Sequence, residues 1–158
     1  MSGLMISCKR RVSIDCGVED AFEYVADWHN YKAFMPMFSG MDPTSLVEYG
    51  VGTSLDTTVM IGKVEIRTTL DITEFLKNKK IVIKATKGFR LRAQWDFKDI
   101  GGKVLITHDF DYDLPSGLSF RAEQKEALEK DVESAACRSM ELLKWLLENN
   151  SKRPEPDY

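Results

Sequence analysis

Five polar side chains occupy strand positions at which apolar residues otherwise recur: Arg10, Thr57, Thr68, His108 and Tyr112. Alternate residues of a strand point to the same face of a sheet, so all five are expected on the buried face. A buried polar group needs a hydrogen-bonding partner. An apolar cavity with a few convergent polar groups is typical of a site that orients a small ligand.

His108 could also transfer protons, because an unperturbed histidine titrates at a pH of about 6.5. It is therefore the candidate catalytic residue, acting as acid or base together with Arg10 or Tyr112. The alternative for each residue is structural. His108 is then a core histidine with satisfied hydrogen bonds, and the guanidinium of Arg10 reaches water at the end of its strand.

The composition indicates one globular domain without a prosthetic group. The chain has 158 residues and a net charge of -3, so no specific nucleic acid partner is expected. Its two histidines and three cysteines lack the spacing of a metal site, and no phosphate-binding glycine motif occurs, so we expect neither metal nor cofactor. Without a signal-peptide pattern, and with an odd number of cysteines, a cytoplasmic location is the simplest expectation.

Alternating apolar residues predict a sheet built from many strands. The first strand is expected at residues 5–14, and six more are expected at residues 44–49, 53–61, 63–75, 81–87, 89–99 and 103–113. Short polar or glycine-containing turns join the six, which favours antiparallel neighbours. The alternation also indicates that one face of the sheet is buried and the other is solvated.

Helical spacing of apolar residues occurs in two parts of the sequence. Residues 18–27 are expected to form a short helix, followed by a second helical turn that ends at Pro36. Residues 119–148 carry the apolar stripe of one long helix, about 45 Å in length. We therefore expect one domain over residues 1–148 and a disordered polar tail over residues 149–158.

This order of elements resembles the helix-grip fold of the START-like (SRPBCC) superfamily, which includes polyketide cyclase/dehydrase and lipid-transport proteins. Three motifs carry the likeness: Asp27, Tyr31, Phe34 and Pro36 at the junction of the second short helix and the second strand, the turn Gly50-Val51-Gly52-Thr53, and the hairpin Gly101-Gly102. The sequence departs from the pattern at Cys16-Gly17, where many members carry a proline before the first helix. This departure affects how that helix begins and not the function.

The resemblance implies an α+β fold in which a seven-stranded antiparallel sheet curls around a long C-terminal helix, with two short helices after the first strand. It also implies an apolar cavity between sheet and helix that holds a lipid, an isoprenoid quinone, as in coenzyme Q-binding relatives, or a polyketide. Besides the five polar residues, the expected lining comprises Phe34, Met35, Met37, Phe38, Leu55, Ile66, Trp95, Phe110, Val132, Ala135, Ala136 and Ser139.

Two groups in this expected lining have alternative interpretations. The bulky residues between 34 and 38 either form the mouth of the cavity or plug the core. The small residues Ala135, Ala136 and Ser139 either leave room for a ligand or let large side chains pack close to the helix.

Binding of a small hydrophobic molecule, for carriage or sequestration, is the favoured function. The first alternative is an enzyme of the cyclase/dehydrase type that uses His108. The second is contact with a macromolecule or a membrane surface through a basic outer face, which comprises Lys77, Lys79, Lys80, Lys84, Lys87, Arg90 and Arg92. That face could equally be a solvated sheet edge that its lysines protect against aggregation.

Overall fold

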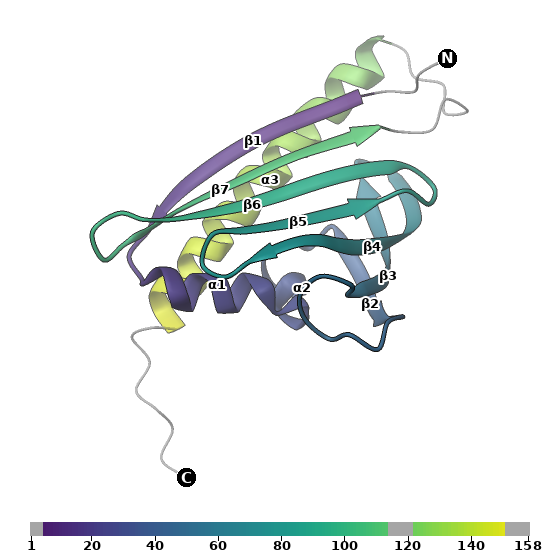
Figure 1. Ribbon diagram of the computed structural model, residues 1–158. Coiled ribbons are helices and arrows are strands. Elements are labelled where there is room, and N and C mark those ends of the chain that lie inside the picture. Colours follow the sequence, from purple (N-terminus) through teal and green to yellow (C-terminus); the bar gives the residue numbers. More distant parts are fainter. Residues whose placement is uncertain (1–4, 114–121, 151–158) are drawn as a thin grey trace.

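The computed structural model describes residues 5–113 and 122–150 (Figure 1). Seven strands form one antiparallel sheet: β1 (Met5–Ile14), β2 (Phe38–Pro43), β3 (Ser54–Ile61), β4 (Val64–Leu76), β5 (Lys80–Ala85), β6 (Arg90–Asp99) and β7 (Val104–Asp113). Their order across the sheet is β1-β7-β6-β5-β4-β3-β2, so the first and last strands are neighbours. The predicted fold is confirmed, including the placement of the N-terminal strand beside the last one.

Two short helices and one long helix cover the inner face of the sheet. They are α1 (Val18–Ala26), α2 (Tyr31–Phe34) and α3 (Ala122–Asn150), with the single 3-10 turn η1 (Trp28–Asn30) between the first two. In Figure 1, α3 runs diagonally behind the strands, and α1 and α2 lie at one end of the sheet. No helix in the described ranges has an apolar stretch long enough to cross a bilayer.

The stripe of α3 that faces the sheet has the spacing expected from the sequence. Its buried residues recur every three or four positions, at Leu128, Val132, Ala136, Ser139, Met140, Leu143 and Leu147. The helix continues two residues beyond the predicted end at 148 and includes Asn150, whereas the division into a domain and a disordered tail stays a prediction. Residues 119–121 of the predicted helix, and residues 151–158 of the predicted tail, lie outside the described residues.

The strand predicted at residues 44–49 is wrong, because β2 ends at Pro43 and a loop follows it. Gly40 and Pro43 are residue types common in turns, so the sequence of β2 does not indicate a strand. Both are tolerated because β2 is an edge strand, pairs only with β3, and has a shift in register between Ser39 and Asp42. The apolar residues of the loop imitate strand alternation, but their side chains are exposed.

Gly88 in the β5–β6 turn and Gly101 in the β6–β7 turn share a backbone conformation but differ in how closely other atoms approach them. Gly88 and Gly101 both have a left-handed φ, of 77° and 78°. A Cβ at Gly88 would lie 2.8 Å from the carbonyl oxygen of Arg67, whereas a Cβ at Gly101 would meet nothing within 4 Å.

We expect Gly101→Ala to lower the free energy of unfolding by about 1 kcal/mol, which is the cost of a left-handed residue with a Cβ. Gly88→Ala should lower it by about 3 kcal/mol, because the backbone of β4 must also move. Urea denaturation of both variants measures the difference. Equal losses would show that the turn does not press against β4.

Candidate functional site

A continuous stack of rings lies on the inner face of β6 and β7. Trp95 and His108 are directly opposite each other in the two strands, and their rings stack with centroids 3.8 Å apart and planes 10° apart. Phe110 follows at 5.1 Å from His108, and Tyr112 lies 5.0 Å from Phe110. All four side chains are buried. The structure therefore brings together four of the residues that the sequence marked as a candidate site.

Helix α2 covers this stack from the side of the short helices. The ring of Phe34 meets that of Trp95 edge to face at 5.9 Å. Burial raises the pKa of Tyr31, and a hydrogen bond with Trp95 offsets part of that rise. Phe34, Met35 and Phe38 all belong to the core, whereas Met37 is only partly buried. Their role in binding a ligand stays a prediction, but Met37 is the member of this group that reaches the surface.

His108 is an uncharged residue in this environment. Burial lowers the pKa of its imidazole from 6.5 to about 3. No hydrogen bond joins the ring to another residue within 5–113 or 122–150, and its main contact is the stacked indole of Trp95. At neutral pH the imidazole is therefore neutral and weakly basic.

Arg10 does not share the space of His108, although the two are paired in register across β1 and β7. Its Nε donates a hydrogen bond to Sγ of Cys137 on α3 at 3.2 Å, and its terminal nitrogen donates to the carbonyl of Lys9. The expected convergence of Arg10 with His108 and Tyr112 is therefore wrong. The cause is that β1 is an edge strand, so the long side chain can carry its charge out to water.

The remaining polar candidates differ in how their hydroxyl groups are bonded. Thr57 donates to the carbonyl of Ser39 at 2.9 Å. Tyr112 donates to the thioether sulfur of Met37 at 3.7 Å. The hydroxyls of Thr68 and Ser139 are buried without a partner among the described residues. Buried hydroxyls without partners are uncommon in folded proteins.

A groove of about 420 Å³ opens beside Met37. The link between α2 and β2, the β3–β4 turn and helix α3 enclose it, and its lining comprises Pro36, Met37, Met60, Gly62, Asp131, Ser134, Ala135 and Arg138. Of the predicted helix residues, Ala135 reaches this groove, whereas Val132 and Ala136 are buried in the core. Met37 is the residue of this lining that also contacts the ring stack, through its bond with Tyr112.

The interior near the short helices is filled by the chain itself. There, an apolar space bordered by Val25, Trp28, Tyr31, Leu55 and Leu70, among others, has a volume of about 10 Å³. Such a space holds about one water molecule. Leu55 and Ile66 are core residues. A ligand larger than water would have to displace side chains of this core.

A family model of polyketide cyclase/dehydrase and lipid-transport proteins matches residues 5–148. The chain belongs to this family. The match covers the strands, the short helices and nearly all of α3, which are the elements that hold the ring stack and the groove. No curated protein sequence matches this member of the family significantly.

Solved structures share the fold of this cyclase-family chain at low sequence identity. The aromatase/cyclase Zhui from a Streptomyces species superimposes with a TM-score of 0.74 and 15% identity, covering 98% of this chain and 100% of its own. A START superfamily protein from Mycobacterium smegmatis gives 0.71 and 14%, covering 91% and 98%. The two-domain aromatase/cyclase StfQ of the steffimycin pathway gives 0.71 and 14%, covering 95% of this chain, which spans 53% of StfQ.

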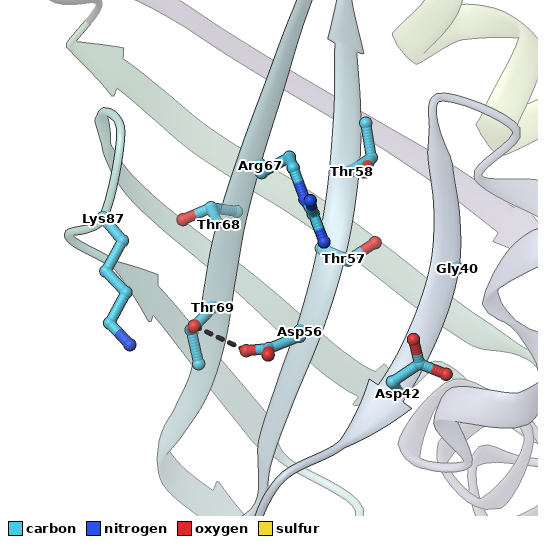
Figure 2. Close-up of a pocket in the computed structure, with 9 residues that line it drawn as sticks. All are labelled: Gly40, Asp42, Asp56, Thr57, Thr58, Arg67, Thr68, Thr69 and Lys87. Carbon is cyan, nitrogen blue, oxygen red and sulfur yellow. Dashed lines mark hydrogen bonds between the residues drawn. The ribbon is translucent and has the colours of Figure 1, made fainter.

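The outer face of the sheet has a separate, polar depression of about 290 Å³ (Figure 2). Figure 2 shows Arg67 extending from β4 toward β3, with Asp42 on β2 and Lys87 on the far side of β4. Thr69 donates a hydrogen bond to Asp56 at 2.7 Å within it. Cations and carboxylates alternate around the depression, which gives it no single charge.

Carboxylates also interrupt the predicted basic outer face. Lys84 lies between Asp71 of β4 and Arg92 of β6, and Arg92 lies beside Asp111 of β7. Arg90 is opposite Asp113 in the same way. Opposite charges that face each other across strands stabilise a sheet. This arrangement favours the solvated-edge interpretation, although contact with a macromolecule stays an untested prediction.

The neutral state of His108 makes stability depend on pH. Its pKa is lowered in the folded protein, so the unfolded chain binds more protons below pH 6.5 and stability falls as the pH decreases from there toward 3. His108→Phe keeps the ring stack but removes this titration. Relative to the variant, the native protein should lose about 2 kcal/mol more stability between pH 7 and 5.

Urea denaturation at a series of pH values measures this difference. If the curve of His108→Phe ran parallel to that of the native protein, the histidine would not be held neutral by burial.

Proposed function

We propose that the protein binds a small, mostly apolar molecule that enters beside Met37 and is oriented by Tyr112. The observation that carries this proposal is the hydrogen bond from the Tyr112 hydroxyl to the thioether of Met37, a residue that lines a groove of about 420 Å³. The family match supports a ligand-binding interior in general.

The Tyr112–Met37 contact suits an exchange of partners. A thioether sulfur is a weak acceptor, so a carbonyl or hydroxyl oxygen of a ligand would bind the tyrosine more strongly. Methionine has three rotatable bonds and can leave its position at small cost. The unpartnered hydroxyls of Thr68 and Ser139 supply further polar contacts in the interior. A ligand with one or two oxygens on an apolar skeleton fits this set of groups.

The ring stack favours a planar ligand. Aromatic rings in offset or edge-to-face contact contribute binding free energy in addition to that from the buried apolar area. A molecule that reaches Tyr112 also meets Phe110 and Phe89. The ring centroids of these two residues lie 5.0 Å and 5.8 Å from that of Tyr112. Aromatic polyketides and quinones have such planar skeletons with peripheral oxygens, and they are the proposed ligand class.

Binding is favoured over acid/base catalysis by His108. A catalytic acid or base works best when its pKa lies near the operating pH. Burial holds the pKa of His108 at about 3, and no second titratable group is hydrogen-bonded to it among the described residues. Two structural neighbours are named as aromatase/cyclases, but the identity of 14–15% carries over their fold alone.

Two ligands with one ring skeleton test the proposal. Anthraquinone carries carbonyl oxygens and anthracene does not, so only the former can accept a hydrogen bond from Tyr112. We expect Tyr112→Phe to weaken anthraquinone binding by about tenfold, the upper range for one hydrogen bond, and to leave anthracene binding unchanged. Quenching of tryptophan fluorescence measures both dissociation constants.

Met37→Ala is the companion variant, because it removes the side chain that blocks the path from the groove. Both molecules should bind faster and more tightly to it. Native mass spectrometry of the purified protein should also show a bound apolar molecule that Met37→Ala retains. Failure of both ring systems to bind the native protein and the Met37→Ala variant would overturn the proposal, as would equal effects of Tyr112→Phe on the two ligands.

A further inference from the structure

The loop between β2 and β3 exposes large apolar side chains. Within six residues, Leu46 is 103% exposed, Val47 42%, Tyr49 49% and Val51 61%. Single apolar residues scattered over a surface are ordinary, but a contiguous group marks a site of interaction. This group is called the apolar loop below and comprises residues 44–53.

Hydrogen bonds at a few positions anchor the apolar loop to the rest of the protein. They run from Ser45 Oγ to the Val47 carbonyl, from Trp28 Nε1 to the Glu48 carbonyl, from the Thr53 amide to the Gly50 carbonyl, and from the Gly52 amide to the Ile72 carbonyl. The exposed apolar side chains therefore project from a segment that is fixed at Glu48 and Gly52.

Two lysines without carboxylate partners lie beside the apolar loop. The ring of Phe75 lies 3.7 Å from the Cβ position of Gly50, so the β4–β5 turn adjoins the loop. That turn exposes Leu76, Lys77 and Lys79, and neither lysine has an ion pair with a residue in the described ranges. Lysines next to an anionic bilayer strengthen its binding by about fivefold each.

We propose that the apolar loop docks the protein on an anionic lipid surface. Leu46 and Val47 enter the boundary of the acyl chains, and Lys77 and Lys79 contact the headgroups. Glu48 is the sole charged residue between 44 and 53, and the charge of Asp27 also acts on Tyr49, so two lysines face two carboxylates at this surface. Apolar contact combined with cationic contact is what reversible membrane attachment requires.

A lipid surface fits the apolar loop better than a protein partner does. A stable protein interface covers about 800 Å² on each partner and has a complementary shape. The apolar loop instead offers a few side chains on one segment, with Leu46 standing free of any neighbour. The loop precedes β3, whereas the Met37 groove lies where β3 ends, so this surface is separate from the proposed ligand site.

Flotation with phospholipid vesicles tests the proposal on the full chain. The native protein should bind phosphatidylcholine vesicles that contain phosphatidylserine, and bind vesicles of phosphatidylcholine alone at least tenfold more weakly. Leu46→Ser combined with Val47→Ser should weaken binding at least tenfold. Ile100→Ser is the matched control, since Ile100 is also an exposed apolar turn residue and should leave binding unchanged.

A second pair of variants separates the lysines of the turn from those of the sheet. Lys77→Glu with Lys79→Glu should abolish the preference for anionic vesicles. Lys84→Glu should not, because Lys84 already faces Asp71. All the substituted residues lie at the surface, so thermal unfolding should confirm an unchanged fold.

Three results would overturn the proposal. The first is that the native protein binds neither kind of vesicle. The second is that the Leu46→Ser, Val47→Ser variant binds vesicles as the native protein does. The third is self-association of the native protein that this double variant abolishes in the absence of lipid, which would assign the loop to contact between copies of the chain.

Discussion

The stacking of Trp95 on His108 is the contact on which the rest of the interior depends. The two residues face each other across β6 and β7, so their rings join the strands at the middle of the sheet. Phe34 and Tyr31 of α2 rest on the same indole and set how closely the short helices approach. Because these rings exclude water, His108 remains neutral and contributes shape rather than charge.

A core packed in this way admits a ligand only where a side chain can move at small cost. Protein interiors are as dense as organic crystals, and rings locked by several neighbours do not yield easily. Met37 differs from its neighbours because it is flexible, partly exposed and held by a weak hydrogen bond. The fold shared with cyclases and a START protein explains the architecture around this position, whereas the identity of a ligand depends on the few groups below it.

The outer face of the sheet is stabilised by charged pairs, whereas the interior is stabilised by packed rings. Across β4 to β7, cations and carboxylates face each other, which stabilises the sheet and leaves little net field. The apolar loop departs from this pattern, because it exposes Leu46, Val47, Tyr49 and Val51 and contains one charged residue, Glu48.

The sequence by itself determined the order of the elements and the family. Strand alternation has a period of two and helix spacing a period near 3.6, so 81–113 and the face of α3 are readable without coordinates. The alternation also placed Trp95, His108, Phe110 and Tyr112 on one face. These features are local, because they depend on residues a few positions apart.

Tertiary structure decided what depends on neighbours distant in the chain. The sequence put Arg10 on the inner face, but the position of β1 at the sheet edge let its guanidinium turn to Cys137. Residues 46–51 alternate like a strand, yet the edge pairing of 38–43 with β3 left them in a loop. Likewise, the lowered pKa of His108 arises from burial, in which Trp95 of the neighbouring strand β6 stacks on its ring. Burial and strand pairing depend on contacts between residues that are far apart in the sequence. A local sequence pattern therefore does not predict them.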